Sequence, residues 1–260
     1  MFLPAFAMAQ TLGNDNYARL TDAQIVVLGE RHDNPYHHQI QADIVKQVMP
    51  KAVVYEMLTP EQAALVRPDI VDDEDALEQA LGWKTSGWPD FAMYYPIFAA
   101  FPMATVYGAA IPRDVARQAM QDGLMAAFGV DADTYGLDVP LTADQQVARE
   151  ALQMSAHCDA LPAELLPAMI DVQRLRDARL AQTALEALKE TGGPIVVITG
   201  NGHARADWGV PAYIKLVQPD VTVASVGQGE DDAAPEGRFD IVVQSPSVPR
   251  EDPCLEFSKE

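Results

Sequence analysis

Residues 25–34 read IVVLGERHDN, an apolar run followed by a glycine and then by polar and charged side chains. The run at residues 25–28 predicts a strand that is buried on both faces. Gly29 allows the chain to leave this strand sharply. Asn34 can cap a helix that begins at Pro35, because the first helical position tolerates a missing N–H group. The stretch therefore predicts a strand, a tight loop and a helix, as in an open α/β sheet.

The loop after this strand carries side chains that suit ligand binding. Side chains that leave the carboxyl end of a strand reach the usual ligand crevice of an open α/β sheet. Glu30, His32 and Asp33 occupy this position. We therefore expect them to contact a ligand.

A second strand near the other end of the chain repeats the arrangement. Residues 194–199 (PIVVIT) predict another buried strand, and GNGH at residues 200–203 repeats the spacing of the earlier GERH. If the two strands are neighbours in a parallel sheet, His32 and His203 face each other across the crevice, with Arg205 beside them. A glycine-rich loop also suits a dinucleotide, but Arg205 stands where a GxGxxG motif needs its third glycine. This position argues against a nucleotide site.

A second carboxylate is expected at the same crevice. Glu56 ends a strand predicted at residues 52–56, much as Glu30 follows the first strand. Carboxylates beside histidines suit either a divalent metal ion or acid/base chemistry with Glu30 or His203 as the base. The metal interpretation uses four ligands, which are Glu30, His32, Glu56 and His203. The structural alternative is that an acid at a strand end only caps the next helix.

Two adjacent histidines begin the predicted helix. The positive end of the helix dipole disfavours a charged imidazole there, and a neutral imidazole can bind a metal or a cofactor. His37 shares the helix face of Ile40 and Ile44, so we expect it to point toward the sheet. His38 lies about 100° further around the helix, and we expect it to be partly solvated. A purely structural role for both histidines is the alternative.

Polar residues interrupt the apolar face of a helix that is predicted to start near Pro167. Gln173 and Asp177 fall on the same face as Leu180, and Arg176 borders it. Burying these polar groups costs free energy unless they find partners. We expect the three polar side chains to form a hydrogen-bonded network behind the histidines. The alternative is a salt bridge at the helix surface.

Further residues are candidates for holding a cofactor. Arg113 follows the third predicted strand and suits a carboxylate or phosphate ligand, and His157 begins a loop that can lie over the crevice. Residues 83–101 are rich in aromatic side chains, which either form core or line a flat hydrophobic cofactor. Tyr94 and Tyr95 lie in this stretch.

The composition excludes some classes of partner. The 260 residues include 38 acidic and 18 basic side chains, which give a net charge of −20. We expect no nucleic-acid partner, because phosphate contacts need clustered Lys and Arg. No apolar run is long enough to span a bilayer. Cys158 and Cys254 lack the CxxC spacing of zinc and redox motifs. Cys158 is interpreted as a small buried residue, with a disulfide between the two in an oxidising compartment as the alternative.

Six predicted strands organise the chain. Besides the two described first, they lie at residues 52–56, 104–107, 221–226 and 239–243, and helical patterns separate most of them. The sequence therefore predicts an α/β fold with a mostly parallel central sheet flanked by helices. Residues 112–191 show helical patterns without a strand pattern, which predicts an inserted helical layer over the crevice.

The chain divides into three predicted segments. Residues 1–19 form an N-terminal segment whose first ten residues fit the end of a signal peptide, with a plain unstructured start as the alternative. Residues 20–244 are expected to form one α/β domain. Within it, residues 229–238 (GEDDAAPEGR) predict an acidic loop. Residues 245–260 are expected to form a disordered tail.

Several stretches together resemble one protein family. They are LGERHDNPYHHQIQ at residues 28–41, WPDFAMYYPI at residues 88–97, AHCDALP and QRLRDARLA within residues 156–181, and TGNGHARADWGVP at residues 199–211. The combination is similar to the ChaN-type haem-binding lipoproteins, which belong to a superfamily with the Tiki and TraB proteins and the erythromycin esterases. The resemblance extends from residue 20 to residue 220.

The resemblance implies haem held between two protomers through a tyrosine, and hence a homodimer. The candidates for this tyrosine are Tyr36, Tyr94, Tyr95 and Tyr107. The other residues expected to contact the cofactor are His32, His37, Arg113, His157, Gln173, Arg176, Asp177 and Arg205. The wider superfamily includes metal-dependent peptide hydrolases that use GxxH motifs and a glutamate, which match residues 29–32, residues 200–203 and Glu56.

Three functional classes remain as hypotheses. The leading one is a haem-binding protein for haem or iron uptake at the cell envelope, in the periplasm or with the cytoplasm as the alternative location. The second is a metal-dependent hydrolase of a small ester, amide or peptide, with Mn, Co or Zn as the metal. The third is a catalytically silent subunit that binds a partner.

Overall fold

The computed structural model describes residues 12–252 and residue 254. The chain divides into two compact units. The first unit takes in Met1–Ala110 and Leu180–Ser247, and the second takes in Ile111–Arg179 and Val248–Glu260. The expected signal-peptide remnant at residues 1–10 lies outside the described residues.

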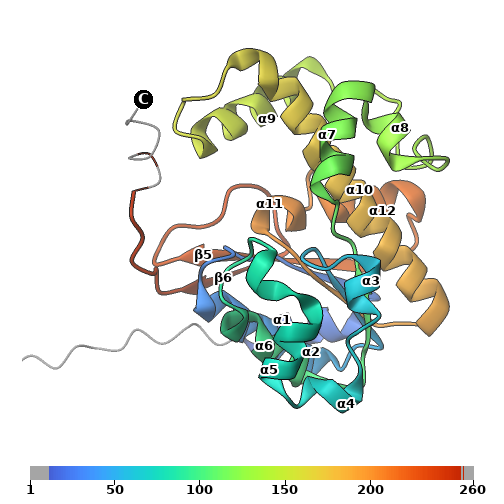
Figure 1. Ribbon diagram of the computed structural model, residues 1–260, viewed down its shortest axis with the longest axis vertical. Coiled ribbons are helices and arrows are strands. Elements are labelled where there is room, and N and C mark those ends of the chain that lie inside the picture. Colours follow the sequence, from blue (N-terminus) through green and yellow to red (C-terminus); the bar gives the residue numbers. More distant parts are fainter. Residues whose placement is uncertain (1–11, 253, 255–260) are drawn as a thin grey trace, which may run out of the picture. The chain divides into compact units, whose positions relative to one another are not determined.

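A six-stranded sheet forms the centre of the first unit (Figure 1). Its strands are β1 (Ile25–Leu28), β2 (Ala52–Tyr55), β3 (Thr105–Gly108), β4 (Ile195–Ile198), β5 (Val223–Glu230) and β6 (Ile241–Ser245), in the spatial order β3-β2-β4-β1-β5-β6. Each pair of neighbouring strands is parallel. The predicted α/β fold with a parallel central sheet is confirmed, and all six predicted strands are present.

The last two strands differ in extent from the prediction. β5 continues past residue 226 to Glu230, so the predicted acidic loop begins inside the sheet. Gly227, just beyond the predicted end of this strand, has a packing role. A Cβ at Gly227 would lie 2.7 Å from the ring of Phe239, so glycine lets this ring sit directly on the strand. β6 reaches Ser245, which was expected to begin the disordered tail.

Helices flank the sheet of the first unit. They are α1 (Asn14–Asp22), α2 (Pro35–Val48), α3 (Pro60–Ala63), α4 (Pro68–Val71), α5 (Glu74–Leu81), the 3₁₀ helix η1 (Trp83–Thr85), α6 (Phe91–Ala100), α11 (Asn201–Ala204) and α12 (Val210–Val217). α2 begins as predicted, with Pro35 in its first turn and with the Asn34 side chain accepting a hydrogen bond from the Tyr36 N–H. This bond satisfies one of the free N–H groups of the first turn.

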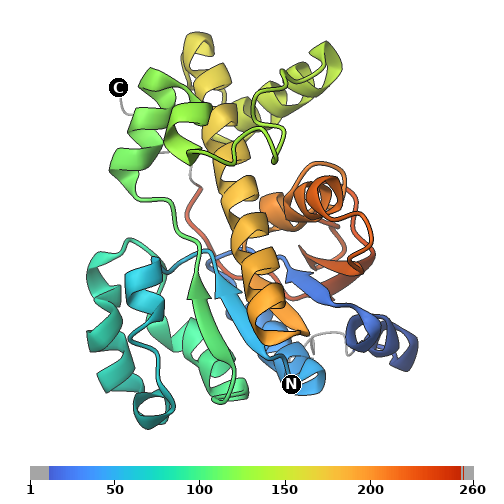
Figure 2. The ribbon, with the colours of Figure 1, turned by 90° about the vertical axis from the view of Figure 1, so that its right-hand side faces the viewer.

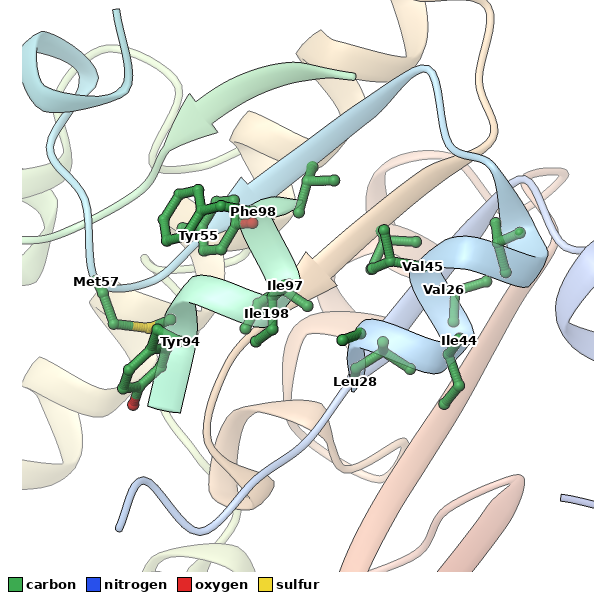
Figure 3. Packing of buried hydrophobic residues seen from close by; sticks show 14 of the residues in the cluster. Val26, Leu28, Ile44, Val45, Tyr55, Met57, Tyr94, Ile97, Phe98 and Ile198 are labelled. Atoms are coloured by element: carbon green, nitrogen blue, oxygen red, sulfur yellow. The ribbon is translucent and has the colours of Figure 1, made fainter. Parts of the chain in front are cut away.

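The core of the first unit lies between the sheet and the helices α2 and α6 (Figure 3). Successive strand residues point to opposite faces, so Val26 and Leu28 contact this helical layer. Tyr55 stacks on Phe98 of α6, with 4.4 Å between the ring centroids. The opposite face of the sheet, which includes the fully buried Val27, lies under the part of α10 (Leu166–Thr191) that follows Leu180 (Figure 2).

The second unit is helical in the part of the chain that is described. It contains α7 (Arg113–Asp122), α8 (Leu124–Phe128), α9 (Ala143–Ala156), the 3₁₀ helix η2 (Ala163–Leu165) and α10 as far as Arg179. These helices confirm the helical pattern predicted after residue 112. The guanidinium of the buried Arg174 donates hydrogen bonds to the carbonyl groups of Gly136 and Val139. It thereby holds the loop between α8 and α9.

A disulfide joins Cys158 to Cys254 within the second unit. The interpretation of Cys158 as a simple buried residue is therefore wrong, and the bridge that was its alternative is formed. The two cysteines are 96 positions apart, so the fold has to bring distant segments together for the bridge to form. Among the described residues, no helix is both long enough and apolar enough to cross a membrane.

Candidate functional site

The loops that follow β1, β4 and β2 meet at the carboxyl edge of the sheet, with β4 between the other two strands. Backbone hydrogen bonds continue beyond the strand ends. The Asn201 N–H donates to the Glu30 carbonyl at 2.9 Å, and the Glu56 N–H donates to the Ile198 carbonyl at 3.1 Å. Glu30 and Glu56 therefore flank the β4 loop, which carries His203. The two strands with GxxH loops are parallel neighbours, as expected.

Glu30 is a fully buried carboxylate with three donor groups around it. Its Oε1 accepts hydrogen bonds from Nδ1 of His32 and from the hydroxyl of Tyr94, each at 2.7 Å. Nε2 of His38 lies 3.4 Å from Oε2, and the His38 ring packs on the Tyr94 ring at 4.1 Å. The Tyr94 hydroxyl points away from the apolar cluster (Figure 3). The β1 loop, α2 and α6 thus meet at one carboxylate.

This arrangement favours the charged forms of both Glu30 and His32. Burial alone would raise the pKa of Glu30, but the hydrogen bonds from His32 and His38 lower it to about 2. Burial alone would lower the pKa of His32, but the hydrogen bond to Glu30 and the negative charge of Glu56 raise it to about 9. His32 is therefore protonated at neutral pH, and a metal ion at Nε2 would replace the Nε2 proton.

The imidazole of His32 is the partly exposed ring of this cluster. The side chain is 36% exposed, and among the described residues Nε2 makes no hydrogen bond. A Cβ at Gly200 would lie only 3.0 Å from Nε2. The backbone of Gly200, with φ −67° and ψ 155°, is one that any residue adopts. Glycine at this position therefore lets the backbone approach the His32 ring closely.

An aromatic ring borders the same imidazole. The ring of Trp88 meets His32 edge-on, with 4.9 Å between the centroids. Trp88 is half-buried, so part of its surface is left for a flat apolar molecule next to His32. The aromatic stretch was predicted to form either core or the wall of a cofactor site. Trp83, Phe91 and Phe98 are buried in the core, whereas Trp88 lies beside His32.

Glu56 lies beside the second histidine of the site. Its Oε2 accepts hydrogen bonds from the Thr199 hydroxyl at 2.6 Å and from the Gly200 N–H at 2.9 Å, and its Oε1 lies 3.6 Å from Nε2 of His203. Burial alone would raise the pKa of Glu56, but the charges of His203 and His32 and these hydrogen bonds lower it. The alternative of an acid that only caps the next helix does not describe Glu56, because its partners Thr199, Gly200 and His203 follow the neighbouring strand β4.

Asn201 fastens the β4 loop to β5. Its side chain donates to the Gln228 carbonyl and accepts from the Gln228 N–H, at 2.8 and 2.9 Å. Gly29 permits this contact, because a Cβ there would lie 2.5 Å from Oδ1 of Asn201. The Gln228 side chain in turn donates to the Gly29 carbonyl at 2.7 Å. The loops that carry His32 and His203 are thus held to one rigid strand.

Both ring nitrogens of His37 bind backbone groups of the protein, so this histidine has a structural role. Its Nδ1 accepts a hydrogen bond from the Arg31 N–H at 2.8 Å, and its Nε2 donates to the Gly229 carbonyl at 3.2 Å. It points inward, as expected, but both ring nitrogens are engaged, so a direct contact with a cofactor does not fit this geometry. The expectation that His38 is partly solvated is wrong, since α6 packs on α2 and buries it completely.

We expect His37 to make the protein less stable in mild acid. Burial is the main cause that lowers the pKa of His37 from the ordinary 6.5, although its bond to Gly229 and the charges of Glu230 and Glu30 oppose this. Below pH 6.5 the unfolded chain takes up a proton that the folded protein resists. The free energy of unfolding should therefore fall toward the lowered pKa, by at most about 1.4 kcal/mol per pH unit.

Urea unfolding between pH 5 and pH 7 measures this effect, with His37→Gln as the comparison. The variant loses stability at every pH, because glutamine does not reproduce both bonds. Its free energy of unfolding should nevertheless change less steeply with pH than that of the parent protein. Equal slopes would contradict the prediction.

Two other predicted site residues of the first unit contact protein groups. Arg205 is buried, forms two hydrogen bonds of 2.6 Å to Asp207, and lies 3.4 Å above the ring of Trp208. Its guanidinium is thus committed to these neighbours. Tyr95 is half-buried, and its ring packs on that of Phe91 at 6.1 Å.

The remaining predicted residues belong to the second unit. Arg113 is exposed at the start of α7. His157 ends α9, with Nδ1 2.8 Å from the Gln153 carbonyl. Asp177 is buried, whereas Gln173 and Arg176 are half-buried. A role for any of these residues beside the histidines stays a prediction.

The four predicted metal ligands follow adjacent strands. They form two separate pairs, each made of one glutamate and one histidine. One couple is Glu30 with His32, and the other is Glu56 with His203. Within residues 12–252 and 254, no group of three or more His, Cys, Asp or Glu side chains converges so as to hold a metal ion. A metal site made only of these four protein ligands therefore does not fit this geometry.

Comparison with known proteins now defines the family. The family of haem-binding uptake proteins of the Tiki superfamily, ChaN, matches residues 17–214. The chain belongs to this family. The expected resemblance is thereby confirmed over most of the first unit and all of the helical insertion. No curated protein matches the chain.

Solved structures show the same fold. ChaN of Campylobacter jejuni, described for its cofacial haem binding, is 18% identical with a TM-score of 0.65, and the match covers 88% of this chain and 90% of that protein. The type III effector HopBA1 is 12% identical with a TM-score of 0.50, over 93% of this chain and 97% of the effector. At these identities the likeness concerns the fold.

Sequence reasoning missed several residues of the site. Thr199 and Asn201 lie within the quoted GxxH stretch, and their position next to a strand end was a usable signal. Trp88 was noted only as part of an aromatic run. Gly200 was interpreted only as part of the repeated GNGH spacing, and the structure shows how closely its backbone approaches His32. Gln228 carried no signal, because its strand appeared to end before it.

Proposed function

We propose that this protein binds haem and that His32 would hold the iron through Nε2. The observation that carries the proposal is the state of this imidazole: Glu30 holds its Nδ1, and among the described residues its Nε2 makes no hydrogen bond. Histidines that ligate metals commonly donate their other N–H group to a carboxylate, and histidine is a frequent axial ligand of haem. Membership of the haem-binding uptake family supports the choice of haem.

The residues around His32 suit a flat, apolar group. The backbone of Gly200 lies close to Nε2 without a side chain between them, and Trp88 offers part of an aromatic surface. Haem, when bound, would supply an iron centre that accepts a nitrogen ligand. Glu30 would keep the imidazole in the tautomer that presents a lone pair at Nε2.

Titration of the purified protein with hemin tests the proposal. A saturable shift of the Soret band is expected. A flat titration at micromolar hemin overturns the proposal. Sedimentation of the same samples with and without hemin tests the expected homodimer.

We expect Gly200→Ala to weaken hemin binding by roughly tenfold or more, the size of effect seen for residues that support a metal ligand. The new methyl group would approach Nε2 of His32 at 3.0 Å, so either the imidazole or the iron must move. The backbone at Gly200 accepts alanine without strain. Hemin titration with absorbance readout measures the change.

Gly202→Ala is the matched control. Gly202 is exposed in α11, which begins directly after Gly200, and a Cβ there would have no neighbour within 4 Å. This variant should bind hemin like the parent protein. Equal affinities for the two alanine variants would contradict the role of Gly200.

We also propose that the protein acts in haem or iron uptake in the periplasm. The disulfide between Cys158 and Cys254 supports this location, because disulfides persist in oxidising compartments and are rare in the cytosol. Fractionation of the source cells with thiol trapping tests it. An oxidised protein in the periplasmic fraction is expected, and a reduced protein in the cytosolic fraction overturns the proposal.

Hydrolysis of a small ester, amide or peptide is the second candidate function. It is favoured by the pairing of each GxxH histidine with a glutamate, since an oriented histidine suits proton transfer. A panel of esters and peptides with added Mn, Co or Zn tests it. Turnover that His203→Ala abolishes supports this function, whereas turnover that His203→Ala leaves undiminished excludes a role for this site.

A further inference from the structure

The helix α9 ends in a backbone motif that normally uses glycine. The Asp159 N–H donates to the Met154 carbonyl at 3.0 Å. The Cys158 N–H donates to the Ser155 carbonyl at 3.1 Å. These two bonds define a Schellman motif, in which the residue after the helix cap adopts a left-handed conformation. That residue is Cys158, with φ 59°, whereas glycine is the usual occupant because it has no Cβ.

The disulfide is formed by the same residue. Cys158 is joined to Cys254, which belongs to the C-terminal segment that follows Ser247. Both cysteines are half-buried, so neither is sealed inside the core of the second unit. The bridge therefore connects two features that are distant in sequence, which are the end of α9 and the C-terminal segment.

The bridge constrains a residue that is otherwise poorly suited to its backbone conformation. The left-handed region costs an L-residue free energy, and apart from glycine only Asn and Asp visit it routinely. Asp159, with φ 56°, is of a suitable type, but Cys158 is not. A covalent bond at its Sγ restricts the alternatives that are open to Cys158, and a free thiol does not.

We propose that the bridge between Cys158 and Cys254 is a redox-sensitive switch that locks the end of α9 and the C-terminal segment together. A dithiol reductant opens it: one thiolate of the reductant attacks a sulfur of the bridge, and its second thiol resolves the mixed disulfide. Two electrons and two protons pass to the protein, which gains two thiols, and the reductant becomes a disulfide. This inference goes beyond the proposed function and needs no bound haem.

Opening the bridge should loosen both features at once. Cys158 is then free to leave the left-handed conformation, so the two hydrogen bonds that end α9 should open more often. The C-terminal segment is no longer fixed to the helix. A bridge that only added general stability would not act selectively on these two places.

Hydrogen exchange of the full-length, hemin-free protein measures the first effect. Cys254→Ala removes the bridge but keeps cysteine in the left-handed position. The amides of Cys158 and Asp159 should exchange roughly five- to thirtyfold faster than in the oxidised parent, the factor that corresponds to the cost of a left-handed residue. The parent treated with excess dithiol should show the same change, and it serves if the variant does not fold. Unchanged exchange after reduction overturns the inference.

Cys158→Gly is the matched variant. It also removes the bridge, but it places the usual residue at the end of α9, so the amides at positions 158 and 159 should stay protected. Trypsin should nevertheless cleave after Arg250 faster in both variants than in the oxidised parent, because the segment is released in both. Equal loss of amide protection in Cys158→Gly and Cys254→Ala overturns the proposed coupling, as does cleavage that is no faster in either variant.

Discussion

Replacement of His32 with alanine should weaken hemin binding by on the order of 100-fold or more, since residues that only support a metal ligand already contribute about 10- to 100-fold. The variant loses the nitrogen that we assign to iron, while Glu30 keeps its hydrogen bond from Tyr94. The Soret band and the charge-transfer region should change as well, because the ligand field of the iron changes. Titration with hemin followed by absorbance measures both effects.

Two further variants make this result specific. His32→Gln can still donate to Glu30 but has no imidazole nitrogen, so it should resemble His32→Ala in hemin binding and the parent protein in stability. Gln39→Ala, on the exposed face of α2, should leave both unchanged. If His32→Ala kept the parent affinity and spectrum, hemin would bind elsewhere on the protein.

The parts of this site that follow from local sequence were predictable. The apolar runs that end at Leu28 and Ile198 predicted two strands. The repeated GxxH spacing indicated that the segments after these strands have similar roles. Asn34 and Pro35 marked the start of α2, because capping depends on residues within one turn. These signals need no knowledge of distant contacts.

The parts that depend on packing between distant segments were not predictable. His38 faces outward from an isolated helix, and only α6 shows that this side is covered. Tyr94 was interpreted as a possible cofactor ligand, because its sequence does not show that Glu30 lies within hydrogen-bond distance. Whether the bridge between Cys158 and Cys254, which was given as an alternative, forms likewise depends on how the chain folds back on itself. In each case the partner lies far away in sequence.

Glu30→Ala should lower the free energy of unfolding by about 3 to 5 kcal/mol, the usual cost of removing one member of a buried charged pair. The carboxylate is fully buried, and its removal leaves the Tyr94 hydroxyl without its acceptor at 2.7 Å and His38 without the charge at 3.4 Å. A buried donor without a partner destabilises the folded state, because it has lost its hydrogen bonds to water and forms none within the protein. Urea unfolding followed by circular dichroism measures the loss.

Glu190→Ala is the matched control for this measurement. Glu190 also accepts a hydrogen bond from a tyrosine, Tyr107, at 2.6 Å, but it lies exposed at the surface. Solvent can replace that bond, so the variant should lose less than about 1 kcal/mol. The two glutamates thus differ mainly in burial. The difference between the free energies of unfolding of the two variants therefore measures the cost of leaving buried donors without a partner. If Glu30→Ala were as stable as Glu190→Ala, water would have to enter the site and satisfy Tyr94 and His38, and Glu30 would not be the residue that organises this cluster.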